Sequence, residues 1–139
     1  MEENSDLYGY KKRIAIGLAK VKEIFEESYS DIKDFTDFMK AKNCSDGRIY
    51  KYVYFLKSLR ELAGKPFREL TKKDIIDLVG KINDKAEWKE STKSEMRGIL
   101  KNYFKWLKQT EEYPEEVKWI RWGMKKNKQL PPEQILTKE

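Results

Sequence analysis

Residues Ser91 to Lys108 carry an apolar stripe at helical spacing, and this stripe restricts the possible folds more than any other feature of the chain. Its members recur three and four positions apart: Met96, Ile99, Leu100, Tyr103, Phe104 and Leu107. This spacing is typical of an α-helix that buries one face in a core. Similar stripes occur in Tyr10–Glu27 and Ser45–Ala63, and no segment has the alternation of a strand. The sequence therefore predicts an all-α fold.

Capping residues predict where the other helices begin and end. Ser30 or Asp31 is expected to cap the N-terminus of a helix that ends near Asn43. Ser45 is expected to cap the next helix, which ends at Gly64. Thr71 to Asp74 is similar to a capping box, and it precedes the apolar positions Ile75, Leu78, Val79 and Ile82. Ser91 or Thr92 is expected to cap the helix described first. A short helical piece is predicted in Val117–Gly123.

Composition excludes several classes of function. The 139 residues fit one domain, and they include no histidine and one cysteine, Cys44. The usual zinc ligand sets and a histidine general base are therefore missing, and no glycine-rich phosphate loop is present. The triplet Asp31, Asp34 and Asp37 is interpreted as a solvated face. We expect no cofactor, no metal and no enzymatic activity. With no disulfide framework, signal peptide or membrane span, the expected location is the cytoplasm, in association with the nucleoid.

Positive charge is concentrated in two segments. The net charge is +6, residues 40–60 carry six basic and one acidic residue, and residues 91–128 carry ten and five. Such asymmetry indicates a polyanionic partner more strongly than uniform basicity does. In the second segment Lys93, Arg97, Lys101 and Lys105 follow one another at four-residue steps, although like charges at this spacing destabilise a helix. Two basic helix faces are thus predicted to form one cationic surface, the alternative being charge that serves solubility alone.

Several short motifs resemble the core-binding domain of tyrosine recombinases of the phage integrase family. They are Ser45-Asp46-Gly47-Arg48-Ile49 with Tyr52 and Leu56, then Leu70 to Ile75, then Tyr103-Phe104-Lys105-Trp106-Leu107. The segment Pro114–Thr137 looks like the interdomain linker of archaeal members. The resemblance covers roughly Tyr29 to Glu139, and it is carried by the order and spacing of the motifs.

This resemblance implies a SAM-like bundle of about four core helices, with an extra N-terminal helix and a basic C-terminal linker. The implied divisions are residues 1–28 for the extension, 29–110 for the core-binding domain and 111–139 for the linker. The family's second and fourth core helices lie against the DNA major groove, and here they correspond to Ser45–Ala63 and Ser91–Lys108. The implied partners are double-stranded DNA, a C-terminal catalytic domain of the same protein and other recombinase protomers on DNA. No membrane is implied.

We therefore expect a DNA-binding domain of a site-specific recombinase or integrase. Arg48 and Arg97 are the candidates for reading base edges, because a guanidinium can bind guanine with two hydrogen bonds. Helix N-termini add phosphate-binding N–H groups. The predicted DNA contacts are Lys42, Ser45, Arg48, Lys51, Thr92, Lys93, Ser94, Arg97, Lys101, Lys105, Arg121, Lys125, Lys126 and Lys128. Two alternatives stay open: a protein-binding module that uses Trp119 and Trp122, and an RNA-binding module that stacks unpaired bases.

Overall fold

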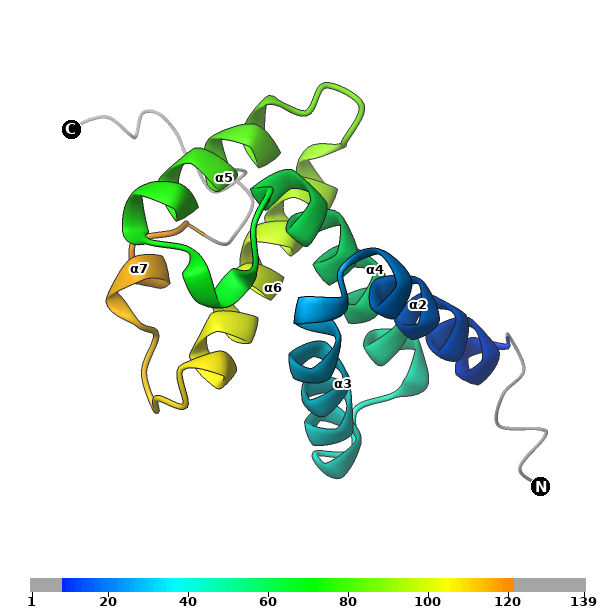
Figure 1. Ribbon diagram of the computed structural model, residues 1–139. Coiled ribbons are helices and arrows are strands. Elements are labelled where there is room, and N and C mark those ends of the chain that lie inside the picture. Colours follow the sequence, from blue (N-terminus) through cyan, green and yellow to red (C-terminus); the bar gives the residue numbers. More distant parts are fainter. Residues whose placement is uncertain (1–8, 122–139) are drawn as a thin grey trace, which may run out of the picture.

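A computed structural model describes residues 9–121, and within this range the chain forms six α-helices, one short 3-10 helix and no strand. The helices are α2 (Tyr10–Ile24), α3 (Glu26–Ala41), α4 (Asp46–Ala63), η1 (Phe67–Glu69), α5 (Lys72–Asp84), α6 (Glu90–Leu107) and α7 (Glu115–Lys118). Figure 1 shows α2 and α3 at one end of the molecule, and α5 and α7 at the other. The all-α prediction is confirmed. None of the helices in the described range is long and apolar enough to cross a membrane.

Helix α4 is the central element, because it contacts α2, α3, α5 and α6. Its ends are set locally, as the sequence predicted. The Ser45 side chain accepts a hydrogen bond from the Arg48 backbone N–H, and Gly64 ends the helix in the left-handed conformation at φ 76°. Along its length, Val53, Leu56 and Leu59 are fully buried. Both cap positions therefore fix the length of the helix that the rest of the fold packs against.

Helix α2 lies close against α4, and Gly17 makes this approach possible. A Cβ atom at residue 17 would lie 2.8 Å from Val53 Cγ1 and 3.1 Å from Tyr54 Cε2. Glycine lowers intrinsic helix stability, but here its missing side chain admits the neighbouring helix. Leu18 and Val21 of α2 are consequently buried in the core. The N-terminal helix is thus packed on the bundle.

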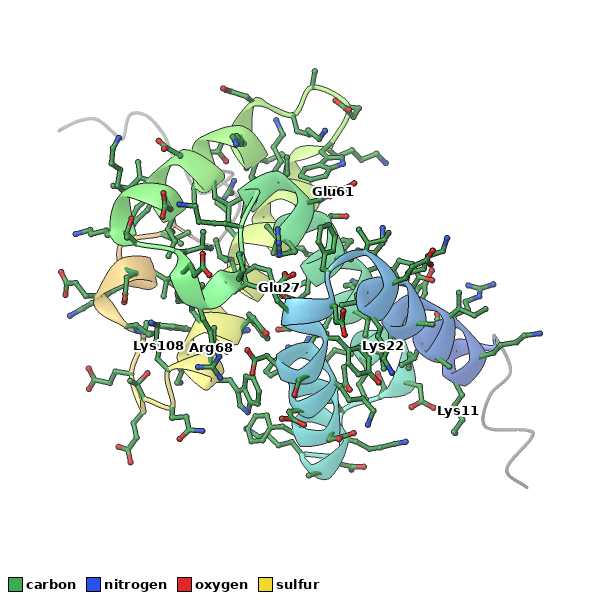
Figure 2. All side chains as sticks on the ribbon, viewed as in Figure 1. Lys11, Lys22, Glu27, Glu61, Arg68 and Lys108 are labelled. Atoms are coloured by element: carbon green, nitrogen blue, oxygen red, sulfur yellow. The ribbon has the colours of Figure 1, made fainter. Side chains whose placement is uncertain are left out.

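The corner between α2 and α3 contradicts the predicted helix ends. Helix α2 stops at Ile24, α3 starts at Glu26, and Ser30 and Asp31 lie inside α3 instead of capping it. The break occurs at Phe25, which offers no side-chain cap. Arg60 of α4 holds this corner, since its guanidinium carbon lies 4.5 Å from the Phe25 ring centroid and its Nε donates to a Glu27 carboxylate oxygen at 2.7 Å. Figure 2 shows Glu27 at the start of α3.

The N-termini of α5 and α6 differ in how well local sequence defines them. At α5 the predicted capping box is confirmed, with Thr71 Oγ1 accepting from the Asp74 N–H while the Asp74 carboxylate accepts from the Thr71 N–H. Helix α6 instead begins at Glu90 after Lys89, and no side chain caps it. The predicted caps Ser91 and Thr92 already belong to its first turn, so that prediction is wrong. The Lys93 N–H donates to the Lys89 carbonyl, so Lys89 stands where the sequence predicted Ser91 or Thr92.

The segment after α6 returns to the bundle. Helix α7 spans Glu115–Lys118, so it starts two residues before the piece predicted over Val117–Gly123 and ends before Trp119. Positions 122 and 123 of that prediction lie outside the described residues. Val117 and Ile120 are buried in the same core as the longer helices. Residues 115–120 therefore pack on the bundle, although they lie in the range expected to be a linker. The three domain boundaries stay predictions.

Candidate nucleic-acid interface

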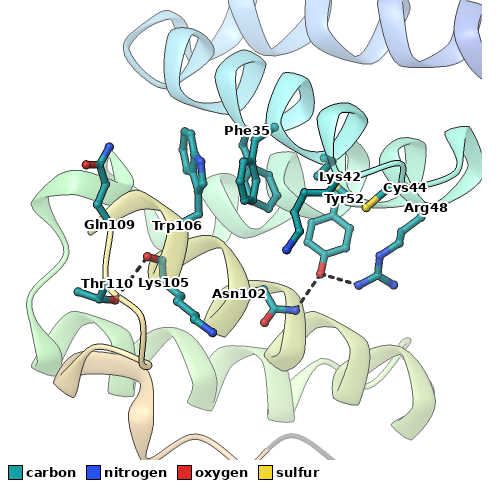
Figure 3. A pocket seen from close by; sticks show the side chains of 12 residues that line it. Phe35, Lys42, Cys44, Arg48, Tyr52, Asn102, Lys105, Trp106, Gln109 and Thr110 are labelled. Atoms are coloured by element: carbon teal, nitrogen blue, oxygen red, sulfur yellow. Dashed lines mark hydrogen bonds between the residues drawn. The ribbon is translucent and has the colours of Figure 1, made fainter.

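A cleft of about 510 Å³ opens between α3, α4 and α6. Figure 3 shows side chains from all three helices and from the turn after α6 facing it. Its rim carries three cations, Lys42 after α3, Arg48 on α4 and Lys105 on α6. Among the described residues that line it, none is acidic. The cleft is consequently a concave surface of positive charge.

Each of the three rim cations is placed by an aromatic ring. Lys42 Nζ lies 5.4 Å from the Phe38 ring centroid, and the Arg48 guanidinium carbon lies 5.2 Å from that of Tyr52. Lys105 Nζ lies 5.1 Å from the ring of Tyr113. Within the described part of the chain none of the three cations has a carboxylate partner within 4.0 Å. Cation–π contacts orient the cations but leave their charge uncompensated.

A chain of hydrogen bonds lies beneath the rim. The Asn102 side-chain amide donates to the Tyr52 hydroxyl at 3.0 Å, and the Tyr113 hydroxyl donates to Asn102 Oδ1 at 3.1 Å. Arg48 reaches the same Tyr52 hydroxyl at 3.4 Å. These contacts tie α4, α6 and the segment before α7 together at the cleft. The polar side of the cleft is therefore held in place before any ligand arrives.

The opposite side of the cleft is aromatic. The Trp106 ring centroid lies 5.1 Å from that of Phe35 and 6.4 Å from that of Phe38. Phe35 is buried, whereas 41% of Phe38 is exposed. The cleft thus combines a wall of tilted aromatic rings with a cationic rim.

Arg97 is not on this surface, which corrects the prediction that it stands in an outward basic row. Only 7% of it is exposed. Its guanidinium donates to the Arg121 carbonyl at 2.8 Å, to Asn83 Oδ1 at 2.7 Å and to a Glu90 carboxylate oxygen at 3.1 Å. All three of its nitrogens are thus used inside the protein. In this conformation the side chain is not free to read a base edge.

Lys101 is also buried, with 8% exposed, so the prediction of an outward position is wrong for this residue too. Its Nζ donates to the Ile120 carbonyl at 3.0 Å and lies 4.5 Å from the Tyr113 ring centroid. Burial lowers the pKa of this ammonium group, because desolvation penalises the charged form. Arg97 and Lys101 thus donate to the backbone carbonyls of Arg121 and Ile120, in the segment after α7. We call this pair and its carbonyl partners the tail clamp.

The other predicted contact residues are divided between the surface and the interior. Lys42, Ser45, Arg48, Lys51 and Arg121 are exposed, Thr92, Lys93 and Lys105 are half-buried, and Ser94 is buried. Lys51 is paired with Glu95 at 2.6 Å, and Lys93 donates to the Asn83 carbonyl at 2.7 Å. Lys125, Lys126 and Lys128 lie outside the described residues. Among the described candidates, Lys42, Arg48 and Lys105 line the cleft, so the row predicted on α6 contributes only Lys105 to it.

The remaining candidates have ordinary structural surroundings. Asp31 binds Arg68 through two hydrogen bonds, and Asp37 pairs with Lys33, so two of the three acids are in ion pairs. No group of three or more metal-ligating side chains is found among residues 9–121. Trp119 is 40% exposed and donates its indole N–H to the Glu116 carbonyl, while Trp122 lies outside the described range.

Sequence reasoning did not identify Trp106, Phe38, Asn102 or Tyr113 as parts of a site. Trp106 carried a signal, because it follows Lys105 and lies off the apolar stripe of its helix. Asn102 and Tyr113 carried none, since their role depends on contacts between separate segments.

Residues 32–113, more than half of the chain, match the family described as phage integrase, N-terminal SAM-like domain. This range contains most of α3 and all of α4, α5 and α6, in agreement with the predicted bundle of about four core helices. Neither a curated protein nor a solved structure matches the chain.

Proposed function

The chain belongs to the family of phage integrase N-terminal SAM-like domains, and we propose that it grips duplex DNA for a site-specific recombinase or integrase. In this role it supplies binding and not catalysis. The proposed partners are double-stranded DNA, a catalytic domain of the same protein and further protomers on the DNA.

The observation that supports DNA binding best is the charge of the cleft. Lys42, Arg48 and Lys105 surround one concavity without an acidic residue among its described lining. Cations that lack carboxylate partners are free to displace the counterions of a phosphate backbone. The exposed Ser45 caps the N-terminus of α4 three residues before Arg48, and a helix N-terminus favours bound phosphate.

The proposed contact set is smaller than the sequence suggested. The set contains Lys42, Ser45, Arg48, Lys51 and Lys105. It also keeps Thr92 and Arg121, which do not line the cleft. Of the two arginines expected to read base edges, Arg48 is kept as the candidate, because it is exposed and Arg97 is held in the tail clamp. The contribution of Lys125, Lys126 and Lys128, the similarity to archaeal members and a nucleoid location stay predictions.

A charge-matched pair of variants tests this proposal. In the cleft variant Lys42, Arg48 and Lys105 are each replaced with Gln, and in the control the exposed Lys12, Lys20 and Lys73 are replaced with Gln. Both variants have the same reduction in charge, so any difference reflects position. Fluorescence anisotropy with labelled duplex DNA is measured over a range of salt concentrations.

We expect the parent to bind with a Kd of about 10⁻⁴–10⁻⁶ M, as is usual for binding without sequence preference. Each phosphate that a removed cation had neutralised should lower the slope of log K against log salt by about 0.9, thus by up to about 2.7 in the cleft variant. The control should keep a slope near that of the parent. Equal slopes for the two variants would refute the placement at the cleft, and absence of duplex binding at low salt would refute the function.

A further inference from the structure

The cleft has a feature that phosphate binding does not require, namely its aromatic wall. Phosphates on a duplex are met by cations on an open surface, and they gain nothing from an apolar cavity. Here Trp106 and the partly exposed Phe38 face a space of about 510 Å³. Figure 3 shows the Lys42 and Lys105 side chains extending from opposite sides of the cleft. A ligand that uses all of this needs both a flat apolar face and negative charge.

A nucleotide has these properties, whereas a base within a duplex does not offer its face. Bases stack on aromatic side chains only when they are unpaired, and such stacking tolerates any base because every base has a π-face. The rim cations would meet the phosphates on either side of the stacked base. The combination of aromatic rings and lysines or arginines in one groove is the arrangement that proteins use for single strands.

Asn102 adds a group that can contact the edge of a base. Its side-chain nitrogen carries two hydrogens, and one hydrogen bond from it, to the Tyr52 hydroxyl, is present. Its oxygen accepts from Tyr113, which fixes the orientation of the amide. Among residues 9–121 the second hydrogen has no acceptor, and Asn102 lines the cleft.

We propose that the cleft holds one unpaired nucleotide of DNA, with its base against Trp106 and Phe38 and its flanking phosphates at Lys42, Arg48 and Lys105. This inference rests on the proposed DNA-binding function and extends it from duplex to locally unpaired DNA. The charge of the rim favours this occupant over an apolar peptide, which would leave three cations without partners.

Three DNA probes of one sequence test the inference. The first is a perfect duplex, the second carries one unpaired nucleotide near its centre, and the third carries an abasic residue at that position. The abasic probe has the same backbone and flexibility without a base to stack. We expect the probe with the unpaired nucleotide to bind about 5- to 100-fold more tightly than the other two, as one base stacked on aromatic rings would give.

Two variants of the cleft are compared with one control. Trp106→Leu and, separately, Phe38→Leu remove an aromatic face and keep an apolar side chain. Trp119→Leu removes a tryptophan that lies outside the cleft and has about the same exposed fraction as Phe38. Either cleft variant should abolish most of the preference for the unpaired nucleotide over the other two probes, and the control should keep it. The preference is a ratio of affinities measured on one protein, so a change that affects all three probes equally, such as a shift of Lys42 away from residue 38, cancels. The Phe38 variant keeps the test valid if Trp106→Leu fails to fold.

The outcomes separate this inference from the proposed function. Duplex binding with equal affinity for all three probes overturns the nucleotide site and leaves the duplex function standing. Such a result would assign the cleft to a ligand of another class, such as an acidic peptide. A preference that persists in the Phe38 and Trp106 variants also overturns it. Failure to bind any probe overturns the DNA-binding function itself.

Discussion

The tail clamp and the cleft both contain cations of α6, but these cations are buried and hydrogen-bonded in the clamp and partly exposed at the cleft. In the tail clamp, Arg97 and Lys101 are buried and bond backbone carbonyls of residues 120 and 121. In the cleft, Lys105 lies one turn further along the same helix, is half-buried and rests its ammonium group against an aromatic ring. Four-residue spacing placed these side chains near one another on the helix. Their neighbours decided which of them stabilise the fold and which remain open to a ligand.

The comparison shows why a basic row on a helix is weak evidence for a binding surface. A buried cation with several hydrogen bonds contributes to folding and is not available to phosphate. A cation held only by a ring keeps most of its charge for a partner. Replacing members of the two regions one at a time should therefore affect different measurements.

Replacing Arg97 with Leu should produce the largest effect. The change removes the three hydrogen bonds that the buried guanidinium makes to Asn83, Glu90 and the Arg121 carbonyl. We expect the free energy of unfolding to fall by about 2–4 kcal/mol. Urea denaturation followed by circular dichroism measures it. The matched control, Arg48→Leu, should stay within about 0.5 kcal/mol of the parent. If the Arg97 variant were as stable as the parent, the tail clamp would not stabilise the fold and would not differ from the cleft in this respect.

The second prediction compares Lys101→Met with Lys105→Met in DNA binding. Both changes remove one charge from α6 and keep side chains of similar length. The Lys105 variant should lower the salt slope of duplex binding by about 0.9, and the Lys101 variant should leave it unchanged. The stability of the Lys101 variant should lie within about 1 kcal/mol of the parent, because methionine fills the space while the Ile120 carbonyl loses its donor. If both variants reduced the slope equally, Lys101 would have to leave the clamp when DNA binds.

The smallest effect concerns pH. Desolvation lowers the pKa of Lys101 in the folded protein below its value in the unfolded chain, so the unfolded chain binds more protons in the interval between the two values. The parent should therefore gain stability relative to Lys101→Met as the pH rises through the folded pKa of this lysine. Thermal unfolding of both proteins at pH 7 and about pH 10 measures this relative gain. A relative loss of stability at high pH would mean that the charged form is favoured in the fold.

The helices could be predicted where their ends depend on nearby residues. Ser45, Gly64 and the Thr71–Asp74 capping box act within three or four positions, and the structure confirms all of them. The start of α3 could not be predicted, because the corner at Phe25 is held by Arg60 from another helix. The start of α6 was also missed, since Lys89 has no capping side chain.

The candidate site could be predicted only in part for the same reason. Lys42, Arg48 and Lys105 were identified from charge, which a sequence displays directly. Arg97 and Lys101 are drawn inward by hydrogen bonds to carbonyls 24 and 19 residues away, and no local pattern indicates such bonds. The aromatic wall could not be predicted, because Phe35 and Phe38 have the spacing of core residues. Phe35, Phe38 and Trp106 form one cluster in which Phe35 is buried and Phe38 is exposed.

Because Gly17 has no side chain, the packed core of this protein extends beyond the segment that defines its family. Residues 32–113 carry the family match, yet α2 lies outside that range and covers Val53 and Tyr54 of α4. A fragment trimmed to the matched range would leave this side of the central helix in water and would lack the buried Leu18 and Val21. The same helix α4 carries Arg48, which lines the cleft. We therefore expect a fragment cut to the matched range to be less stable than one that also contains α2.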